Sequence, residues 1–226
     1  MLSRHIQLFV TELKQSKLLA ALPFALLGIP YAYFLLSYML AGVDLDDLVI
    51  ALMLLQFDKR AAYLPLVGIS LLGYLSAGNI FQRASDVFLI KDRHHLSKAC
   101  LRASTSFLFF ACVCAAVTIA FAPELYAAIL LISARALAGS LLCLWAIAFV
   151  SYLFRAVPMG VLIALGYTMV SYGTLGVILP EDNPPVWHTP ELGFPMINYF
   201  LFASISALSL FVLLIVCERY AKRASS

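Results

Sequence analysis

Charged side chains are scarce in this sequence. Lys, Arg, Asp and Glu together make up 12% of its 226 residues, whereas 63% of the residues are hydrophobic. A soluble domain of this composition would expose large apolar surfaces to water, so the composition excludes an ordinary soluble protein and predicts an integral membrane protein. The net charge is only +3 and no basic cluster is interleaved with aromatic residues, so a nucleic-acid-binding surface is not indicated either.

The sequence also lacks the motifs of several membrane-embedded enzyme classes. It contains no G-x-S-x-G nucleophile elbow, no H-E-x-x-H zinc motif and no D-x-x-D-G carboxylate pattern. His94 and His95 are adjacent, so on a helix they would point about 100° apart and would not easily share one metal ion. We therefore expect no catalytic residue, no metal site and no cofactor bound by this chain.

Six uncharged runs are long enough to cross about 30 Å of hydrocarbon as helices. They predict a single all-α membrane domain over residues 1–226, with spans at about 18–42, 62–82, 103–122, 136–154, 157–179 and 196–217. Two further apolar runs, 48–57 and 125–134, are too short to cross and are bounded by charged residues. We expect both of them to be interfacial or re-entrant segments.

The distribution of basic residues predicts the orientation of the chain. If both termini are cytoplasmic, twelve of the fifteen Lys and Arg residues lie inside and only Lys59, Arg60 and Arg135 lie outside. Eight acidic residues also lie outside: Asp44, Asp46, Asp47, Asp58, Glu124, Glu181, Asp182 and Glu191. Arg135 would need a partner near mid-membrane if the fourth span began well before it, and would be an interfacial anchor if the span began at 136. The second alternative is favoured, because 136–154 is already long enough to span. The expected location is the plasma or inner membrane of a bacterium.

Two segments outside the spans have a recognisable pattern. Residues 4–17 place apolar side chains at helical spacing, which predicts an amphipathic helix on the inner leaflet, either a plain anchor or an elbow that couples a partner to the first span. Residues 180–195 are rich in proline and predict an irregular outer loop. This loop is either a stiff external turn or a lid over an exit path.

The segment between the second and third spans, SDVFLIKDRHHLSK (residues 85–98, the docking segment), mixes large apolar side chains with charges. A short helix lying across the membrane face would put the apolar residues against the bundle and the charges toward solvent. The segment is either a solvated loop or a docking surface for a cytosolic protein. The docking candidates are Asp86, Phe88, Leu89, Lys91, Asp92, Arg93, His94 and His95.

This arrangement resembles the permease subunit of type-2 ABC transporters of the exporter class. The resemblance lies in the layout of the whole chain: the amphipathic stretch TELKQSK before a first span with Pro23 and Pro30, a long cytoplasmic loop that ends near Lys98, and the enlarged outer loop LPEDNPPVWHTPELGFP. In that family the loop after the second span contains the coupling helix that fits a groove on the ATPase subunit. The resemblance implies this role for the docking segment.

The resemblance also implies partners and a path for cargo. No G-x-x-x-x-G-K-[ST] motif is present, so ATP and Mg would be bound by a separate cytosolic ABC ATPase, and a second permease copy or related subunit would complete a dimer. The family's second and fifth spans line the path at the dimer seam. Ser70 and Tyr74 with Tyr167, Ser171 and Thr174 would line it here, although small and polar residues also serve helix packing.

Two other functions stay open from the sequence. A secondary transporter would need ionisable groups inside the spans for coupling, and only Arg135 is a candidate for such a group. A non-transporting membrane scaffold fits the composition equally well.

Overall fold

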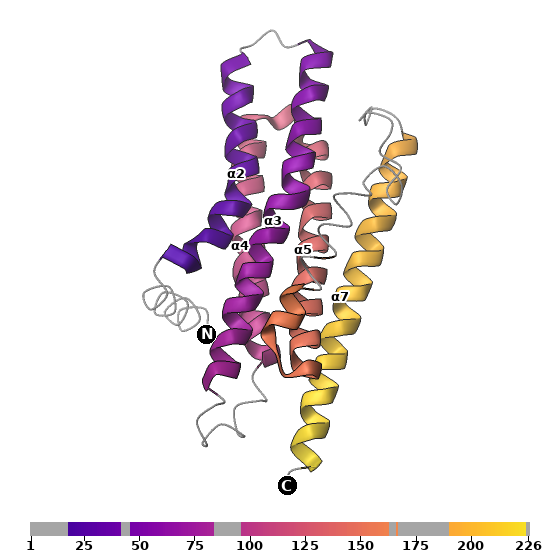
Figure 1. Cartoon of the computed structure of the whole chain (residues 1–226). Coiled ribbons are helices and arrows are strands. Elements are labelled where there is room, and N and C mark those ends of the chain that lie inside the picture. Colours follow the sequence, from indigo (N-terminus) through magenta and orange to yellow (C-terminus); the bar gives the residue numbers. More distant parts are fainter. Residues whose placement is uncertain (1–17, 42–45, 84–95, 163–165, 167–189, 225–226) are drawn as a thin grey trace.

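The computed structural model describes residues 18–41, 46–83, 96–162, 166 and 190–224, and every regular element in these ranges is a helix (Figure 1). A short 3-10 turn leads from the third long helix into the fourth, and residues 157–162 are also helical. The labelled elements are α2 (Leu18–Ala41), α3 (Asp47–Arg83), α4 (Leu96–Phe121), η3 (Pro123–Leu125), α5 (Tyr126–Phe154) and α7 (Pro190–Ala224).

Four described segments are long and apolar enough to cross a membrane. They are Ala21–Ala41, Leu96–Phe121, Pro123–Phe154 and Leu201–Tyr220. Large apolar side chains on these segments point outward, including Leu36, Phe109 and Phe202, each more than half exposed, as lipid-facing residues are. The prediction of an all-helical membrane protein is confirmed at this level, while the number of six spans and the cytoplasmic position of both termini stay predictions.

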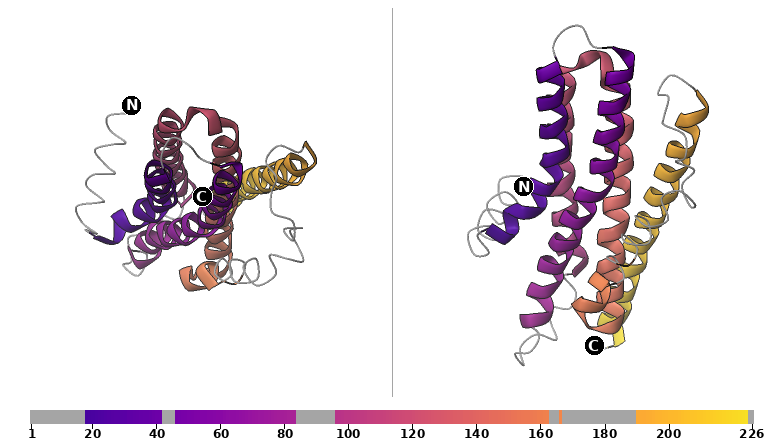
Figure 2. Two further views of the ribbon diagram at one scale, coloured as in Figure 1. Left: turned by 90° about the horizontal axis from the view of Figure 1, so that it is seen from above. Right: turned by 45° about the horizontal axis from the view of Figure 1, so that its top comes forward.

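Helix α5 lies at the centre of the bundle. It packs against α3, α4 and α7, while α2 packs against α3 and α4. Viewed from above, α7 stands to one side of the other helices (Figure 2). Helices α5 and α7 both end at the lower end of Figure 1, so they run in the same direction. The six-span layout requires α5 and α7 to run in the same direction, because it places one span between these two helices in the sequence.

The expectation for the two short apolar runs is wrong. Residues 48–57 are not a separate interfacial segment, because the 37-residue helix α3 continues through them without a break. Residues 125–134 likewise belong to η3 and α5 rather than to a re-entrant piece. A charged residue does not end a membrane helix when a neighbouring helix neutralises it, and Asp58 and Arg135 neutralise each other here.

Other boundaries differ by a few residues from those expected. Helix α4 begins at Leu96, so the last three residues of the docking segment belong to a helix long enough to span. Helix α7 begins at Pro190, inside the expected outer loop. The amphipathic stretch 4–17, the rest of the docking segment and most of 157–179 and 180–195 lie outside the described residues.

The chain turns sharply after α5. Arg155 adopts a left-handed backbone conformation with φ of 53°, which ends the helix at Phe154, and the chain becomes helical again at Val157. Beyond the turn, a Cβ atom at Gly160 would lie 2.6 Å from the carbonyl oxygen of Ile147. Only glycine lets the returning chain lie this close to the backbone of α5.

The buried side chains form two clusters. The larger cluster joins α2, α3, α4 and α5 and contains the fully buried Phe34, Phe57 and Phe107. The smaller cluster joins α5 and α7 to the start of α4, with the ring centroids of Trp145 and Phe211 4.7 Å apart. Helix α7 is therefore attached to the bundle mainly through α5.

Helices α2 and α3 approach each other closely at Gly68. A Cβ atom at this position would lie 2.8 Å from the backbone carbonyl oxygen of Pro23. A side chain of any size would push the two helices apart, because a backbone atom cannot rotate away as a side chain can. Gly28 provides a matched comparison, because its Cβ would lie 3.6 Å from the ring of Phe110, an ordinary contact distance.

We predict that Gly68→Ala lowers the free energy of unfolding by about 1–3 kcal/mol through overpacking. Gly28→Ala should be neutral or stabilising, since alanine favours a helix over glycine by about 1 kcal/mol. Thermal unfolding of both purified variants in the same detergent measures the difference. An unfolding midpoint of Gly68→Ala at or above that of the unmodified protein would contradict the close approach.

Candidate functional site

The most unusual feature of the bundle is an ion pair among apolar side chains. Asp58 on α3 accepts a hydrogen bond from the guanidinium group of Arg135 on α5. Only 4% of the surface of Asp58 and 9% of that of Arg135 are exposed. Two opposite charges held together in this way neutralise each other, so neither helix carries an isolated charge into the interior. We call Asp58 and Arg135 the central ion pair.

The depth of the central ion pair follows from its neighbours on α2. Tyr31 is the middle residue of the candidate span Ala21–Ala41. Its ring centroid lies 5.2 Å from that of Phe57, the residue before Asp58. Its hydroxyl group donates to Oγ of Ser133, two residues before Arg135, at 3.0 Å. The ion pair therefore lies level with the middle of the α2 segment, about 15 Å from either end of that segment at ~1.5 Å per residue.

This finding corrects the position expected for Arg135 and Asp58. Both were predicted to lie outside the membrane, with Arg135 as an interfacial anchor. Instead, the fourth apolar helix begins well before Arg135, and the side chain is paired inside the bundle. Of the two alternatives, the structure shows the one in which the helix begins well before Arg135 and the side chain has a partner, while its depth in the membrane stays a prediction. The signal in the sequence was Arg135 as the one charged residue in the stretch 125–154, together with Asp58 in the stretch 48–70, which also contains Lys59 and Arg60.

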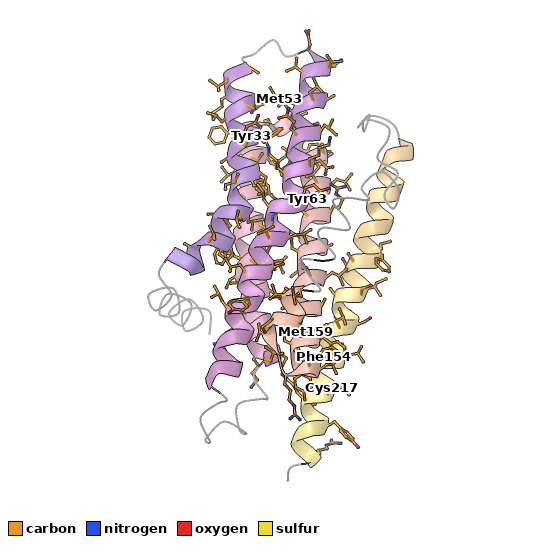
Figure 3. The ribbon with its side chains drawn as sticks, viewed as in Figure 1. Tyr33, Met53, Tyr63, Phe154, Met159 and Cys217 are labelled. Atoms are coloured by element: carbon orange, nitrogen blue, oxygen red, sulfur yellow. The ribbon has the colours of Figure 1, made fainter. Side chains whose placement is uncertain are left out.

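A second polar group faces outward at the same depth. Gln56, Lys59 and Arg60 follow one another at helical spacing on α3, and Tyr33 of α2 lies beside them. The Tyr33 hydroxyl donates to Oε1 of Gln56 at 3.2 Å, and the guanidinium carbon of Arg60 lies 3.2 Å from the Tyr33 ring centroid. Lys59 is exposed, as is Tyr33, which Figure 3 labels in the upper half of the bundle. We call these four residues the cationic face.

At the upper end of the bundle, α2 is connected to the turn between α4 and α5. The hydroxyl group of Tyr38 donates to the carboxylate of Glu124 in η3. Both side chains lie near the ends of their candidate spans, where tyrosine and charged residues commonly mark the interface with water. This contact and the central ion pair hold α2, α3 and α5 together over the upper half of the bundle.

The opposite end of the bundle contains a buried carboxylate. Glu218 on α7 is 5% exposed and accepts two hydrogen bonds from Ser97 near the start of α4, one from the backbone N–H at 3.0 Å and one from the hydroxyl group. A carboxylate is favourable at a helix N-terminus because the N–H groups there lack intrahelical partners. On the residue before it, the carbonyl of Cys217 accepts from the Tyr152 hydroxyl of α5 at 3.2 Å. We call the contact of Glu218 with Ser97 the Glu218 cap.

Figure 3 shows where these two regions lie. Tyr33 and Tyr63 are labelled in the upper half, and Phe154, Met159 and Cys217 toward the lower end. Helix α5 passes through both regions, because it carries Arg135 in the upper one and Tyr152 in the lower one. The described polar contacts between helices are therefore concentrated at two levels of the bundle.

No family model, curated protein or solved structure matches this chain.

The predicted docking residues lie outside the described part of the chain. They are Asp86, Phe88, Leu89, Lys91, Asp92, Arg93, His94 and His95. Among the predicted path residues, Tyr167, Ser171 and Thr174 also lie outside it. These expectations stay predictions.

The two described path residues have different surroundings. Ser70 is buried, donates to the carbonyl of Leu66 at 2.7 Å and lies 3.5 Å from Sγ of Cys143. Tyr74 is 40% exposed. Ser70 thus lies in a packed contact between α3 and α5. This agrees with the alternative that small and polar residues here serve helix packing.

We predict that breaking the central ion pair on one side is more harmful than removing it altogether. Asp58→Asn or Arg135→Gln alone leaves one buried charge without its partner and should lower the free energy of unfolding by about 3–5 kcal/mol. The double variant leaves no such charge and should recover much of that loss. Unfolding of the unmodified chain, the two single variants and the double variant in one detergent gives the coupling energy between the two side chains. If the loss of stability in the double variant equals the sum of the two single losses, the pairing is contradicted.

Proposed function

We propose that this chain is the membrane-spanning permease subunit of an ATP-driven ABC exporter, acting with a second permease copy or a related subunit. A separate cytosolic ATPase would dock on residues 85–98 and would bind ATP and Mg. The layout that resembles the type-2 permease family supports this proposal. So does the absence of a nucleotide-binding motif from the sequence, because an exporter of this kind takes its energy from another chain.

The observation that carries the proposal is the Glu218 cap. The docking segment ends where α4 begins, and at this junction Ser97 is bound to a buried carboxylate of α7. A displacement of the docking segment would therefore act on two helices at once, since α4 and α7 are joined at that point. Such a rigid connection suits a segment whose role is to transmit movement from a partner.

In this mechanism, ATP-driven closure of two ATPases would push the docking segments of two permease subunits. The push would pass through α4 and α7 to α5, which both helices contact. Helix α5 carries one member of the central ion pair, so the movement would reach the buried interior of the bundle. Access to the cargo path would then alternate between the two sides.

A secondary transporter is the second candidate, and a specific observation favours it. Coupling to an ion gradient requires ionisable groups inside the spans, and the central ion pair consists of two such groups buried between apolar helices. In that case the Asp58 carboxylate would separate from Arg135 and bind a proton or a cation during transport. No ATPase would be needed, and transport by the purified chain in vesicles would follow the ion gradient.

We predict that a P-loop ATPase co-purifies with the tagged chain in mild detergent. Reversing the charges with Asp92→Arg and Arg93→Asp should remove the ATPase, because the docking segment would present the wrong charges. The matched control is Asp46→Arg, an exposed reversal at the start of α3, which should retain it. Mass spectrometry and ATP hydrolysis by the eluate measure the result. Purification of the unmodified chain without any ATPase would favour the secondary transporter or the scaffold.

We further predict that the Glu218 cap transmits the movement. In the assembled complex, addition of ATP and vanadate should change amide hydrogen exchange both at the start of α4 and near residue 218 of α7. Glu218→Ala should leave the ATPase bound and restrict the change to α4. An unaltered response of α7 in this variant would show that another contact carries the movement.

A further inference from the structure

Basic side chains gather at the lower end of the bundle, where Figure 3 labels Phe154. Lys98 on α4, Arg155 after α5 and Arg219 on α7 are exposed, and each lies within two residues of the end of a candidate span. Arg102, one turn further along α4, is half-buried and donates from Nε to the carbonyl of Lys98 at 3.4 Å. We call these four residues the basic rim.

The Glu218 cap places two cations of the basic rim on neighbouring helices at one level. Ser97 precedes Lys98 and Glu218 precedes Arg219, and the backbone N–H of Ser97 lies 3.0 Å from the Glu218 carboxylate. Helices in such direct contact have axes about 8–10 Å apart. The starts and ends of these two spans therefore meet at a fixed position, and each carries an exposed cation there.

The end of α5 is held at the same level. The hydroxyl group of Tyr152, three residues before Arg155, donates to the carbonyl of Cys217 on α7 at 3.2 Å. Three candidate spans, each recognised separately by its length and composition, thus end together. A common end of several apolar helices is where lipid headgroups meet a membrane protein.

The carboxylate at this level leaves most of the charge of the basic rim in place. Glu218 is 5% exposed and contributes at most one negative charge against four positive ones. The other carboxylates whose side chains the structure describes lie in the upper half of the bundle. They are Asp46, Asp47, Asp58 and Glu124. The described residues at the lower end therefore attract anions.

Exposed apolar side chains adjoin the basic rim on all three helices, on the side toward the middle of the bundle. On α4 and α7 they lie one helical turn from the cation, and on α5 directly before it. These side chains are Leu101, Val216 and Phe154. An acidic protein surface would complement only the cations, whereas a molecule with an anionic head and hydrocarbon chains complements both parts.

We infer that the basic rim binds the phosphate group of an anionic phospholipid, whose acyl chains lie along the exposed apolar side chains above it. Lysine and arginine donate charge-assisted hydrogen bonds to phosphate oxygens, and basic sites between membrane helices are suited to lipid headgroups. This inference goes beyond the proposed exporter and does not depend on it, because the site is formed by this chain alone.

The rigidity of the lower end distinguishes this site from a general attraction of basic residues to a membrane surface. Such attraction is diffuse and screened by salt. Here the Glu218 cap and the Tyr152 hydrogen bond hold the three helix ends before any lipid arrives. A site that is already organised loses less entropy on binding, so it retains individual lipid molecules.

The test is native mass spectrometry of the delipidated chain in detergent, titrated with phosphatidylglycerol or with phosphatidylcholine of identical acyl chains. The unmodified chain should bind the first phosphatidylglycerol about tenfold more tightly than phosphatidylcholine or better. Lys98→Gln with Arg219→Gln should abolish this preference, while Lys98→Arg should preserve it. Lys59→Gln with Arg60→Gln, the matched loss of two positive charges in the upper half, should preserve it as well. An excess of sn-glycerol 3-phosphate should not displace the lipid, because it lacks acyl chains.

Equal binding of the two lipids by the unmodified chain would overturn the inference, as would a preference that survives in the variant of Lys98 and Arg219. Displacement by sn-glycerol 3-phosphate would assign the site to free phosphate compounds and would also overturn it. So would loss of a co-purifying ATPase from that variant without any lipid preference, because the rim would then be a protein-docking surface. If the double variant does not yield folded protein by size exclusion, Arg219→Gln is compared with Lys59→Gln, since both side chains are exposed.

Discussion

The central ion pair is the constraint on which the arrangement of the upper bundle depends. A single buried charge among apolar side chains is unfavourable, so α3 and α5 pack stably at this level only when Asp58 and Arg135 face each other. This requirement fixes the rotation of both helices and their relative height. Tyr31 and Phe57 then pack beside the pair, and α2 is positioned by its hydrogen bond to Ser133. The same register turns Gln56, Lys59 and Arg60 toward the outside of α3.

Helix α5 connects this polar level with the lower end of the bundle. It contacts α3 through Arg135 and α7 through Trp145 and Tyr152. The Glu218 cap then joins α7 to the start of α4, so three helices meet where the docking segment ends. A transporter needs such continuity, since an event at one membrane surface must change the surroundings of cargo near the middle. The proposed exporter and the secondary transporter would both use this route, and they differ in the source of energy.

The sequence alone predicted the helices whose apolar runs are free of internal charges. Helix α2 and the apolar part of α4 were expected near their observed positions, because length and hydropathy suffice for such segments. The α3 and α5 helices were cut short, since each charged residue was treated as lying outside the membrane. Pairing between residues that are distant in sequence depends on the tertiary structure, so a hydropathy profile cannot predict it. Glu218 was overlooked for the same reason, because it lies beside Arg219 and reads as part of a basic tail.

The separation of Asp58 and Arg135 along the chain has a consequence for biogenesis. The two residues are 77 positions apart, so the ribosome finishes α3 well before it makes the partner of Asp58. At ~5–20 residues per second, the carboxylate waits about 4–15 s for its guanidinium. During this interval α3 is poorly suited to free lipid, and release from the insertion machinery is favourable only once α5 arrives. On this argument, we expect the segment from α2 to α5 to enter the membrane as one cooperative unit, and a chain truncated before Arg135 to be a target for quality control.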